Sequence, residues 1–276
     1  MATGERRWDP RISPPALFAG RILRTAASRS RKTRPARIQG AGPGERIRQG
    51  PVSGHGGYPG RVILGVDTSL GSAVGMIGRD GRTLADVAQA GHLGHAEAIG
   101  SLLEQVLAAA PAEGSEEVPD PLTHVASGMG PGPFTGLRIG IAAARAFALG
   151  RGVPVIAVPS HHAAALAVIE GEHPPQHPFA ILTDARRRET AVTVYEGIDV
   201  DGIPHAVVDT VLVPQGDVDR KLGALRRFEV ASISGAAIAR VARRAVAAGR
   251  TLTGSEPLYL RAPDARVPSA PKRVGS

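Results

Sequence analysis

The tripeptide Asp67-Thr68-Ser69, with Gly71 shortly after it, is the part of the chain best suited to chemistry. It directly follows the apolar run 62–66, and a carboxylate with two hydroxyls at the end of a buried strand could hold a metal ion or a phosphate. A working phosphate site would also want a lysine, or a Mg²⁺ ion held by more than one acid, and no second acid accompanies this motif. A strand-end Asp-Thr-Ser is also a common turn, and we expect a structural role.

A glycine- and proline-rich loop at 128–136 is the second candidate, with Gly130, Gly132 and Thr135 among its residues. Glycine permits close backbone approach, and a helix start exposes unpaired N–H groups, so such a loop could bind an anion. It lacks the Gly-Lys-Ser/Thr ending of a P-loop and the spacing of a dinucleotide-binding fingerprint. Pro133 also removes one N–H donor at the helix entrance. We therefore predict a rigid turn that sets the direction of the next helix.

Three further polar groups fit structural roles better than chemistry. His92 and His95 are three residues apart, but no third metal ligand accompanies them, and the adjacent His161 and His162 face apart on a helix. The basic run 186–188 could contact a nucleic-acid phosphate, although a solvated turn between two strands is the preferred interpretation. No local motif indicates a Ser-His-Asp triad. We predict neither a catalytic residue nor a metal site.

Hydrophobic patterning predicts strands and helices after residue 60. The apolar run 62–67 has the pattern of a strand buried on both faces, and Ser160 and Ser234 are expected helix caps. Strands are predicted at 62–67, 72–77, 83–88, 122–127, 153–158, 179–183, 190–195, 205–213 and 228–234, and helices at 96–110, 135–149, 161–169, 215–226 and 236–248. Two α/β lobes with mixed sheets fit this order better than a uniformly parallel sheet.

Charge is unevenly distributed along the chain. The formal net charge is +8, yet the first 60 residues alone hold 12 basic and 3 acidic residues, so the remainder is close to neutral. This segment is rich in Pro, Gly and Ser without periodicity, which predicts disorder; it could be a start-site artefact, an RNA-binding arm or a transit peptide. The absence of cysteine fits a reducing compartment, and no apolar run approaches the ~20 residues of a membrane span. We expect a cytoplasmic protein without membrane contact.

Four motifs in matching order resemble the TsaB (YeaZ) family. They are VILGVDTS at 62–69, GPGPFTGLRIG at 130–140, DARR at 184–187 and PLYLR at 257–261. The resemblance implies an α/β, two-lobed fold of the actin, Hsp70 and sugar-kinase type (ribonuclease H-like) with mixed sheets. We assign the first lobe to 61–159, the second lobe to 160–262 and a flexible tail to 263–276.

The resemblance also implies a role in forming threonylcarbamoyladenosine in tRNA. The chain would be a non-catalytic partner of a TsaD transferase subunit and a TsaE ATPase, reaching tRNA indirectly through the complex. The motif at Asp67 would be a degenerate nucleotide pocket without a tightly bound cofactor, and a nucleotide could lie at the partner interface. A homodimer could form when the partner is missing. An ATP-dependent phosphotransferase or ATPase that uses Asp67 and Thr68 is the alternative.

Two helices are predicted to carry the partner interface. The helix at 135–149 is apolar nearly all round, with Arg138 and Arg145 its only charges, so it needs more cover than one lobe readily supplies. The helix at 95–109 is the other candidate. The predicted contact residues are His95, Ile99, Leu102, Leu103, Val106, Arg138, Ile139, Ala142, Ala143 and Ala146.

Overall fold

The structure, a computed structural model, describes residues 61–91, 95–110 and 122–261. The predicted disordered extension at 1–60, the flexible tail at 263–276 and His92 lie outside the described residues. The described elements are β1 (Val62–Asp67), β2 (Ser72–Ile77), β3 (Thr83–Gln89), α2 (His95–Ala109), β4 (Leu122–Gly128), α3 (Phe134–Arg151), β5 (Val155–Val158), α4 (Ser160–Ile169), β6 (Phe179–Asp184), β7 (Glu189–Ile198), β8 (Pro204–Pro214), the 3-10 turn η1 (Gln215–Asp217), α5 (Val218–Leu222), β9 (Arg226–Glu229) and α6 (Gly235–Ala247).

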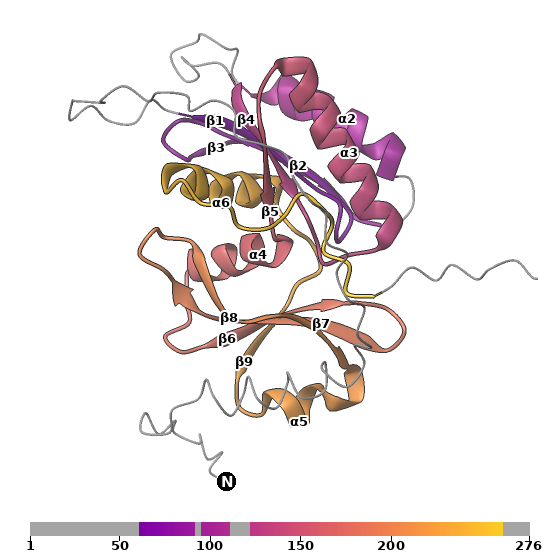
Figure 1. The fold of residues 1–276 in the computed structure, drawn as a ribbon, viewed down its shortest axis with the longest axis vertical. Coiled ribbons are helices and arrows are strands. Elements are labelled where there is room, and N and C mark those ends of the chain that lie inside the picture. The colour runs from indigo at the N-terminus through magenta and orange to yellow at the C-terminus, as the bar shows by residue number, and fades with distance from the viewer. Residues whose placement is uncertain (1–60, 92–94, 111–121, 262–276) are drawn as a thin grey trace, which may run out of the picture.

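Two mixed sheets and their helices stack in layers (Figure 1). The first sheet has the order β3-β2-β1-β4-β5, in which β1, β2 and β3 pair antiparallel and β1, β4 and β5 pair parallel. Helices α2 and α3 cover one of its faces and α6 covers the other. Helix α4 lies between α6 and the second sheet, whose order is β8-β7-β6-β9, and α5 lies beyond that sheet.

Strand β1 is buried along its whole length, as its unbroken apolar sequence predicts. Because side chains alternate along a strand, its residues divide between two cores. Ile63 belongs to the core between the sheets, together with Phe179 and Tyr195 of the second sheet. Leu64 and Val66 belong to the core beneath α2 and α3. The two sheets are therefore joined through a shared, helix-filled core.

Helix α6 reaches the first sheet through three glycines that leave no room for side chains. A Cβ atom on Gly65 would lie 2.0 Å from the carbonyl oxygen of Gly235, and one on Gly75 would lie 2.2 Å from the Ala236 nitrogen. The predicted cap is confirmed, since the Ser234 hydroxyl accepts a hydrogen bond from the Ala237 N–H at 2.9 Å. Although the division at 159/160 assigns α6 to the second lobe, it packs on the sheet of the first.

Three local predictions were wrong. The predicted helix at 215–226 is a 3-10 turn followed by the short α5, because Gly223 (φ 56°) ends the helix and β9 begins at Arg226. The strand predicted at 228–234 is correspondingly β9 at Arg226–Glu229. Ser160 does not cap α4, because the capping position is Pro159 and no side chain caps this helix. The Ser160 hydroxyl is used elsewhere, as described below.

Candidate functional site

The carboxylate of Asp67 lies at the end of β1, where its oxygens bond to neighbouring donors. One oxygen accepts hydrogen bonds from the Ser69 N–H at 2.8 Å and the Ser69 hydroxyl at 2.5 Å. The other accepts a hydrogen bond from the Ser160 hydroxyl at 2.5 Å, and Ser160 Oγ in turn accepts one from the Gly130 N–H at 3.0 Å. Asp67 is only 2% exposed. Both carboxylate oxygens thus face donors of the chain itself.

The glycine-rich loop closes tightly over this carboxylate. A Cβ atom on Gly128 would lie 1.9 Å from an Asp67 oxygen, and one on Gly132 would lie 2.7 Å from the Cα of Ser69. The Thr68 hydroxyl donates to the Gly136 carbonyl at 2.7 Å, which joins the end of β1 to the first turn of α3. The predicted pocket residues therefore come together, but their polar groups are turned toward one another.

The remaining pocket residues also have local structural roles. Gly71 has φ 110° at the turn before β2, and Gly130 has φ 96°, so both occupy backbone conformations that favour glycine. Thr135 is exposed in the first turn of α3. Burial raises the pKa of the Asp67 carboxyl above its ordinary value, while the hydrogen bonds from Ser160 and Ser69 act in the opposite direction. Burial therefore works against this carboxylate as a ligand for cations, while the hydrogen bonds help to keep it ionised.

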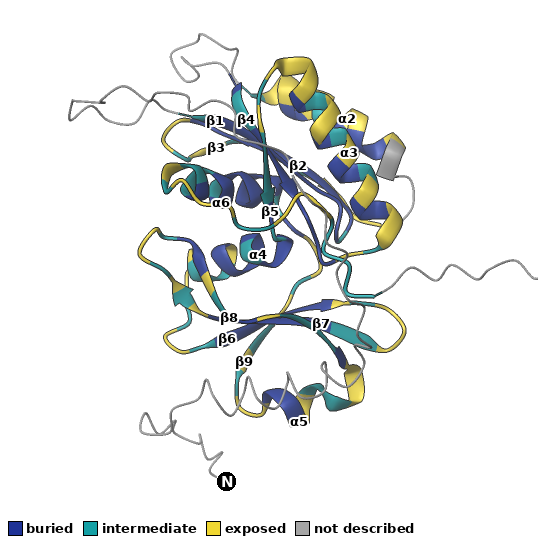
Figure 2. Cartoon of the chain, viewed as in Figure 1, coloured by how far each residue is buried: buried dark blue, intermediate teal, exposed yellow. Residues whose placement is uncertain are grey.

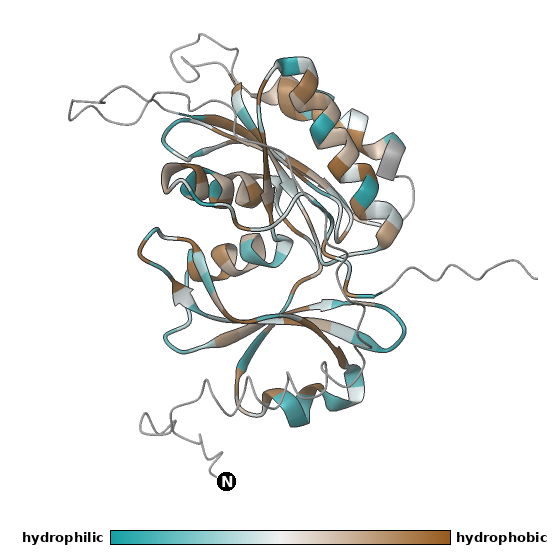
Figure 3. Cartoon of the chain, in the orientation of Figure 1, coloured by the Kyte–Doolittle hydropathy of each residue, from teal (hydrophilic) through white to brown (hydrophobic). Residues whose placement is uncertain are grey.

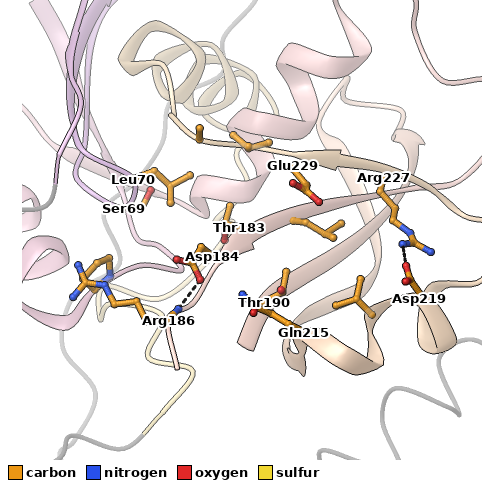
Figure 4. Close-up of a pocket in the computed structure, with 15 residues that line it drawn as sticks. Ser69, Leu70, Thr183, Asp184, Arg186, Thr190, Gln215, Asp219, Arg227 and Glu229 are labelled. Carbon is orange, nitrogen blue, oxygen red and sulfur yellow. Dashed lines mark hydrogen bonds and ion pairs between the residues drawn. The ribbon is translucent and has the colours of Figure 1, made fainter. Parts of the chain in front are cut away.

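A cleft of about 720 Å³ lies beside this motif, between the two lobes (Figure 4). The first lobe contributes Ser69, Leu70 and Pro133, whereas Asp67 and Thr68 do not line it. The second lobe contributes polar residues of mixed charge: Thr183, Asp184, Arg186, Thr190, Gln215, Asp219, Arg227 and Glu229. The side chains of Arg227 and Asp219 pair with each other. The cleft therefore offers no single sign of charge along this wall.

The predicted interface residues fall into buried and exposed sets. Ile99, Leu102 and Val106 are buried in the core between α2 and the first sheet. Leu103, Ile139 and Ala143 are partly buried, and Arg138, Ala142 and Ala146 are exposed. His95 begins α2, and its side chain is outside the described part of the structure. On α3 the sequence could not tell which side faces inward, because both sides are apolar. On α2 the exposed side carries the polar residues Glu97, Ser101, Glu104 and Gln105.

The outward side of α3 is exposed and largely apolar. Its exposed positions follow helical spacing at Arg138, Ala142, Ala146 and Leu149, and Leu149 is 83% exposed. Leu107 on the neighbouring α2 is 43% exposed. Exposed stretches of both helices in Figure 2 are hydrophobic in Figure 3. We call the exposed apolar residues Ala142, Ala146 and Leu149 of α3, together with Leu107 of α2, the α3 face.

A C-terminal segment, residues 252–261, runs back along α3. The Arg138 Nε–H donates to the Tyr259 hydroxyl at 2.8 Å, and the Phe134 and Tyr259 rings stack with centroids 4.8 Å apart. The Arg145 guanidinium donates to the Ser255 carbonyl, and the Leu258 N–H donates to the Met129 carbonyl at 2.8 Å. The sequence marked 257–261 as a family motif but did not indicate this role. The segment engages both charges in the middle of α3.

The loop at 184–189 has an unusual backbone. Arg186, Arg187 and Arg188 all have positive φ angles, 61°, 54° and 59°. For residues other than glycine this left-handed conformation costs about 1–2 kcal/mol each. Nothing in the sequence predicted it, because no glycine or asparagine occurs in the run.

Both histidines of α4 are hydrogen-bonded, with His161 buried and His162 partly buried. His161 contacts the Thr193 and Thr183 hydroxyls at 2.7 and 2.9 Å, and burial lowers its pKa to about 3. His162 contacts the Tyr195 hydroxyl at 2.9 Å, and burial lowers its pKa to about 4. Among the described residues, no group of three His, Asp or Glu side chains could hold a metal ion. Both histidines belong to the core between the lobes.

Comparison with known proteins agrees with this architecture. The family model for TsaD, tRNA N6-adenosine threonylcarbamoyltransferase, matches residues 89–213. YeaZ from Pseudomonas aeruginosa has a similar structure, with a TM-score of 0.56 and 22% identity over 72% of this chain and 100% of that chain. A second structure, described as similar to peptidase YeaZ from Pseudomonas aeruginosa, gives a TM-score of 0.58 and 22% identity over 73% of this chain and 100% of that chain.

Curated mycobacterial proteins match over shorter lengths. An uncharacterized protein of Mycobacterium leprae is 32% identical over 146 residues, which are 51% of this chain and 37% of the relative. One of Mycobacterium tuberculosis is 43% identical over 82 residues, which are 30% of this chain and 34% of the relative. The chain thus spans about a third of the length of the curated relatives it matches.

The fold has two mixed sheets with helices packed on and between them, and the Asp67 motif closes at the end of β1. A TsaD-family model matches residues 89–213, and the fold of the chain is similar to that of two solved YeaZ structures. The tRNA-modification-related family is the one that these matches support. No helix among the described residues is long and apolar enough to cross a membrane.

Proposed function

We propose that the chain is a non-catalytic subunit that supports a TsaD-type enzyme in transferring a threonylcarbamoyl group to the adenosine next to the tRNA anticodon. The observation that carries the proposal is the closed state of the Asp67 motif. Its carboxylate accepts three hydrogen bonds from Ser69 and Ser160, and the glycine loop packs against it so closely that a Cβ atom on Gly128 would lie 1.9 Å from an Asp67 oxygen. Phosphate-transfer sites instead turn such groups toward the ligand.

The α3 face is the proposed docking surface for the TsaD-type subunit. Small side chains at Ala142 and Ala146 let another helix approach closely, and covering the exposed Leu149 would contribute about 1.5–3 kcal/mol. The bonds from Arg138 to Tyr259 and from Arg145 to Ser255 draw the two charges toward the C-terminal segment. An apolar face with its charges held to one side suits a protein partner.

Other parts of the assembly extend the proposal. A TsaE-type ATPase would join the complex, and tRNA would be held mainly by the transferase subunit. Any nucleotide would lie at the interface between the subunits, since the Asp67 motif offers no free oxygen, and the chain itself would bind no cofactor tightly. Without its partner, the same α3 face could pair two copies of the chain. The proposed location is the cytoplasm, where tRNA is modified.

Co-expression with the TsaD-type subunit of the same organism tests this role. We expect a stable complex in size-exclusion chromatography with mass measurement. Ala146→Glu should abolish the complex while leaving the melting temperature of the isolated chain unchanged, because residue 146 is exposed. Ala167→Glu is the matched control, since it places the same charge at an exposed position on α4. If both variants bind the subunit as the parent does, the α3 face is not the interface.

The phosphotransferase alternative makes the opposite prediction. An enzyme of this fold would hydrolyse ATP alone, and Asp67→Asn would abolish the hydrolysis. The phosphotransferase proposal would replace the scaffold proposal if the purified chain released phosphate from ATP, and if this release were lost in Asp67→Asn but retained in Ala146→Glu. We expect no such activity.

A further inference from the structure

The loop of three left-handed arginines is fixed from several directions. The Arg186 N–H donates to an Asp184 carboxylate oxygen at 2.9 Å, and the Gln215 N–H donates to the Arg188 carbonyl at 2.8 Å. The Arg261 guanidinium donates to the Arg186 carbonyl at 3.2 Å and pairs with Glu189. Backbone strain persists only where surrounding contacts over-determine it, and it concentrates at functional sites. These contacts hold the loop in its left-handed conformation.

The conformation presents three exposed arginine side chains on adjacent residues. Consecutive residues in a left-handed turn point in different directions, so the side chains of Arg186, Arg187 and Arg188 spread apart. The neighbouring acids are already engaged, because Asp184 accepts from a backbone N–H and Glu189 pairs with Arg261. Within the described ranges, neither the Arg186 nor the Arg188 guanidinium forms an ion pair with a carboxylate. The loop therefore keeps a concentrated positive charge.

The loop also lies at the edge of the inter-lobe cleft. Arg186 and Asp184 line the cleft on the side of the second lobe, and Ser69 and Pro133 line it on the first (Figure 4). Arg261, which holds the loop, belongs to the same C-terminal segment that contacts α3 through Tyr259. The position of the loop is thus fixed relative to the proposed docking surface by one continuous stretch of chain.

We propose that Arg186 and Arg188 form a binding site for phosphate groups, with the phosphodiester backbone of RNA as the favoured source. The guanidinium fork matches the geometry of phosphate oxygens, and two such forks spread on a rigid loop suit successive phosphates of a strand. Both side chains are exposed. This exposure favours an RNA backbone that passes over the rim of the cleft as the ligand, in preference to a small molecule held inside the cleft. The choice of RNA rests on the proposed function, whereas the site rests on the loop geometry alone.

The test measures binding of a short fluorescein-labelled single-stranded RNA by fluorescence anisotropy, with the full chain at several salt concentrations. For Arg186→Gln/Arg188→Gln we expect affinity at low salt to fall at least about tenfold and the salt slope to decrease by about 1 per lost contact. Arg82→Gln is the control for net charge, because Arg82 is exposed on the β2–β3 turn of the other lobe. It should change affinity by no more than about twofold for its single charge.

A glycine variant separates binding from folding. Glycine adopts positive φ without strain, so Arg188→Gly should melt no lower than the parent chain yet bind RNA more weakly. If ATP competes with RNA for the parent chain, and competes less well for the double variant, the site binds the phosphates of free nucleotides. If the double variant loses affinity for RNA alone, the site binds the RNA backbone. RNA affinity unchanged in the double variant, or lowered equally in Arg82→Gln, would overturn the proposal. The isolated chain suffices, so failure here leaves the docking test on α3 unaffected.

Discussion

Replacing Asp67 distinguishes a structural carboxylate from a catalytic one. Hydrogen bonds to charged groups contribute about 1.5–3 kcal/mol each, so the three accepted by Asp67 amount to roughly 4.5–9 kcal/mol. Removing the carboxylate also removes the penalty of burying it, which is several kcal/mol. We therefore expect Asp67→Ala to lower the free energy of unfolding by about 3 kcal/mol. Asp67→Asn should cost only about 1 kcal/mol, because the amide keeps the volume and one acceptor oxygen.

The assay is urea unfolding followed by far-ultraviolet circular dichroism. The single tryptophan, Trp8, precedes the described residues, so its fluorescence is a poor probe of the lobes. The urea midpoint should fall in the order parent, Asp67→Asn, Asp67→Ala, with an unchanged slope. Free energies of unfolding for both variants within about 0.5 kcal/mol of the parent would refute the structural interpretation, since substitutions of surface or purely catalytic carboxylates have such small effects.

Three more predictions follow from local packing. Gly140→Ala should lower the free energy of unfolding by at least about 2 kcal/mol in the same urea assay, because the new Cβ atom would lie 2.1 Å from Thr68 Oγ1. Gly150→Ala is the control: it has open space around it, so it should be neutral or stabilising. His161 is held neutral by a pKa lowered to about 3, so below about pH 6.5 the unfolded chain binds a proton that the folded chain does not, and stability falls on acidification. His161 accounts for about 2 kcal/mol of this loss from pH 7 to pH 5, and His162, whose pKa is lowered to about 4, accounts for a further part. In the same urea assay, His161→Gln should remove the His161 share and leave the His162 share. Ser127→Ala should be neutral or stabilising by up to about 1 kcal/mol in thermal melts, because this buried hydroxyl finds no partner among the described residues; a loss of more than 1 kcal/mol would contradict this.

Elements with a clear apolar pattern were predicted from the sequence. The strands at 62–67 and 72–77 were confirmed at both ends, because residues buried on both faces leave an unbroken apolar run. The helix predicted at 215–226 failed because Gly223, with φ 56°, ends α5 and β9 begins at Arg226. Local pattern specifies an element most reliably when most of its residues are buried.

The candidate site was predicted in part. The sequence identified Asp67 and the glycine loop, but the Ser160 hydroxyl that completes the site comes from a residue 93 positions away. Its role depends on where α4 begins relative to β1, which no local pattern encodes. The same limit applies to α3: its composition predicted an uncovered apolar surface, but only packing could separate the buried Leu137 and Ile141 from the exposed Ala142 and Ala146.

The seating of α6 on the first sheet has a consequence for how the chain folds. Until residues 235–247 have been synthesised, Gly65, Gly75 and the apolar side chains of Ile63 and Ile77 have no helix to cover them. The amino-terminal sheet is therefore completed by one of the last elements of the described chain, and closing that contact spans most of its length. A fragment that ended at Pro159 would expose this sheet face to water, so the two lobes mature together instead of one after the other.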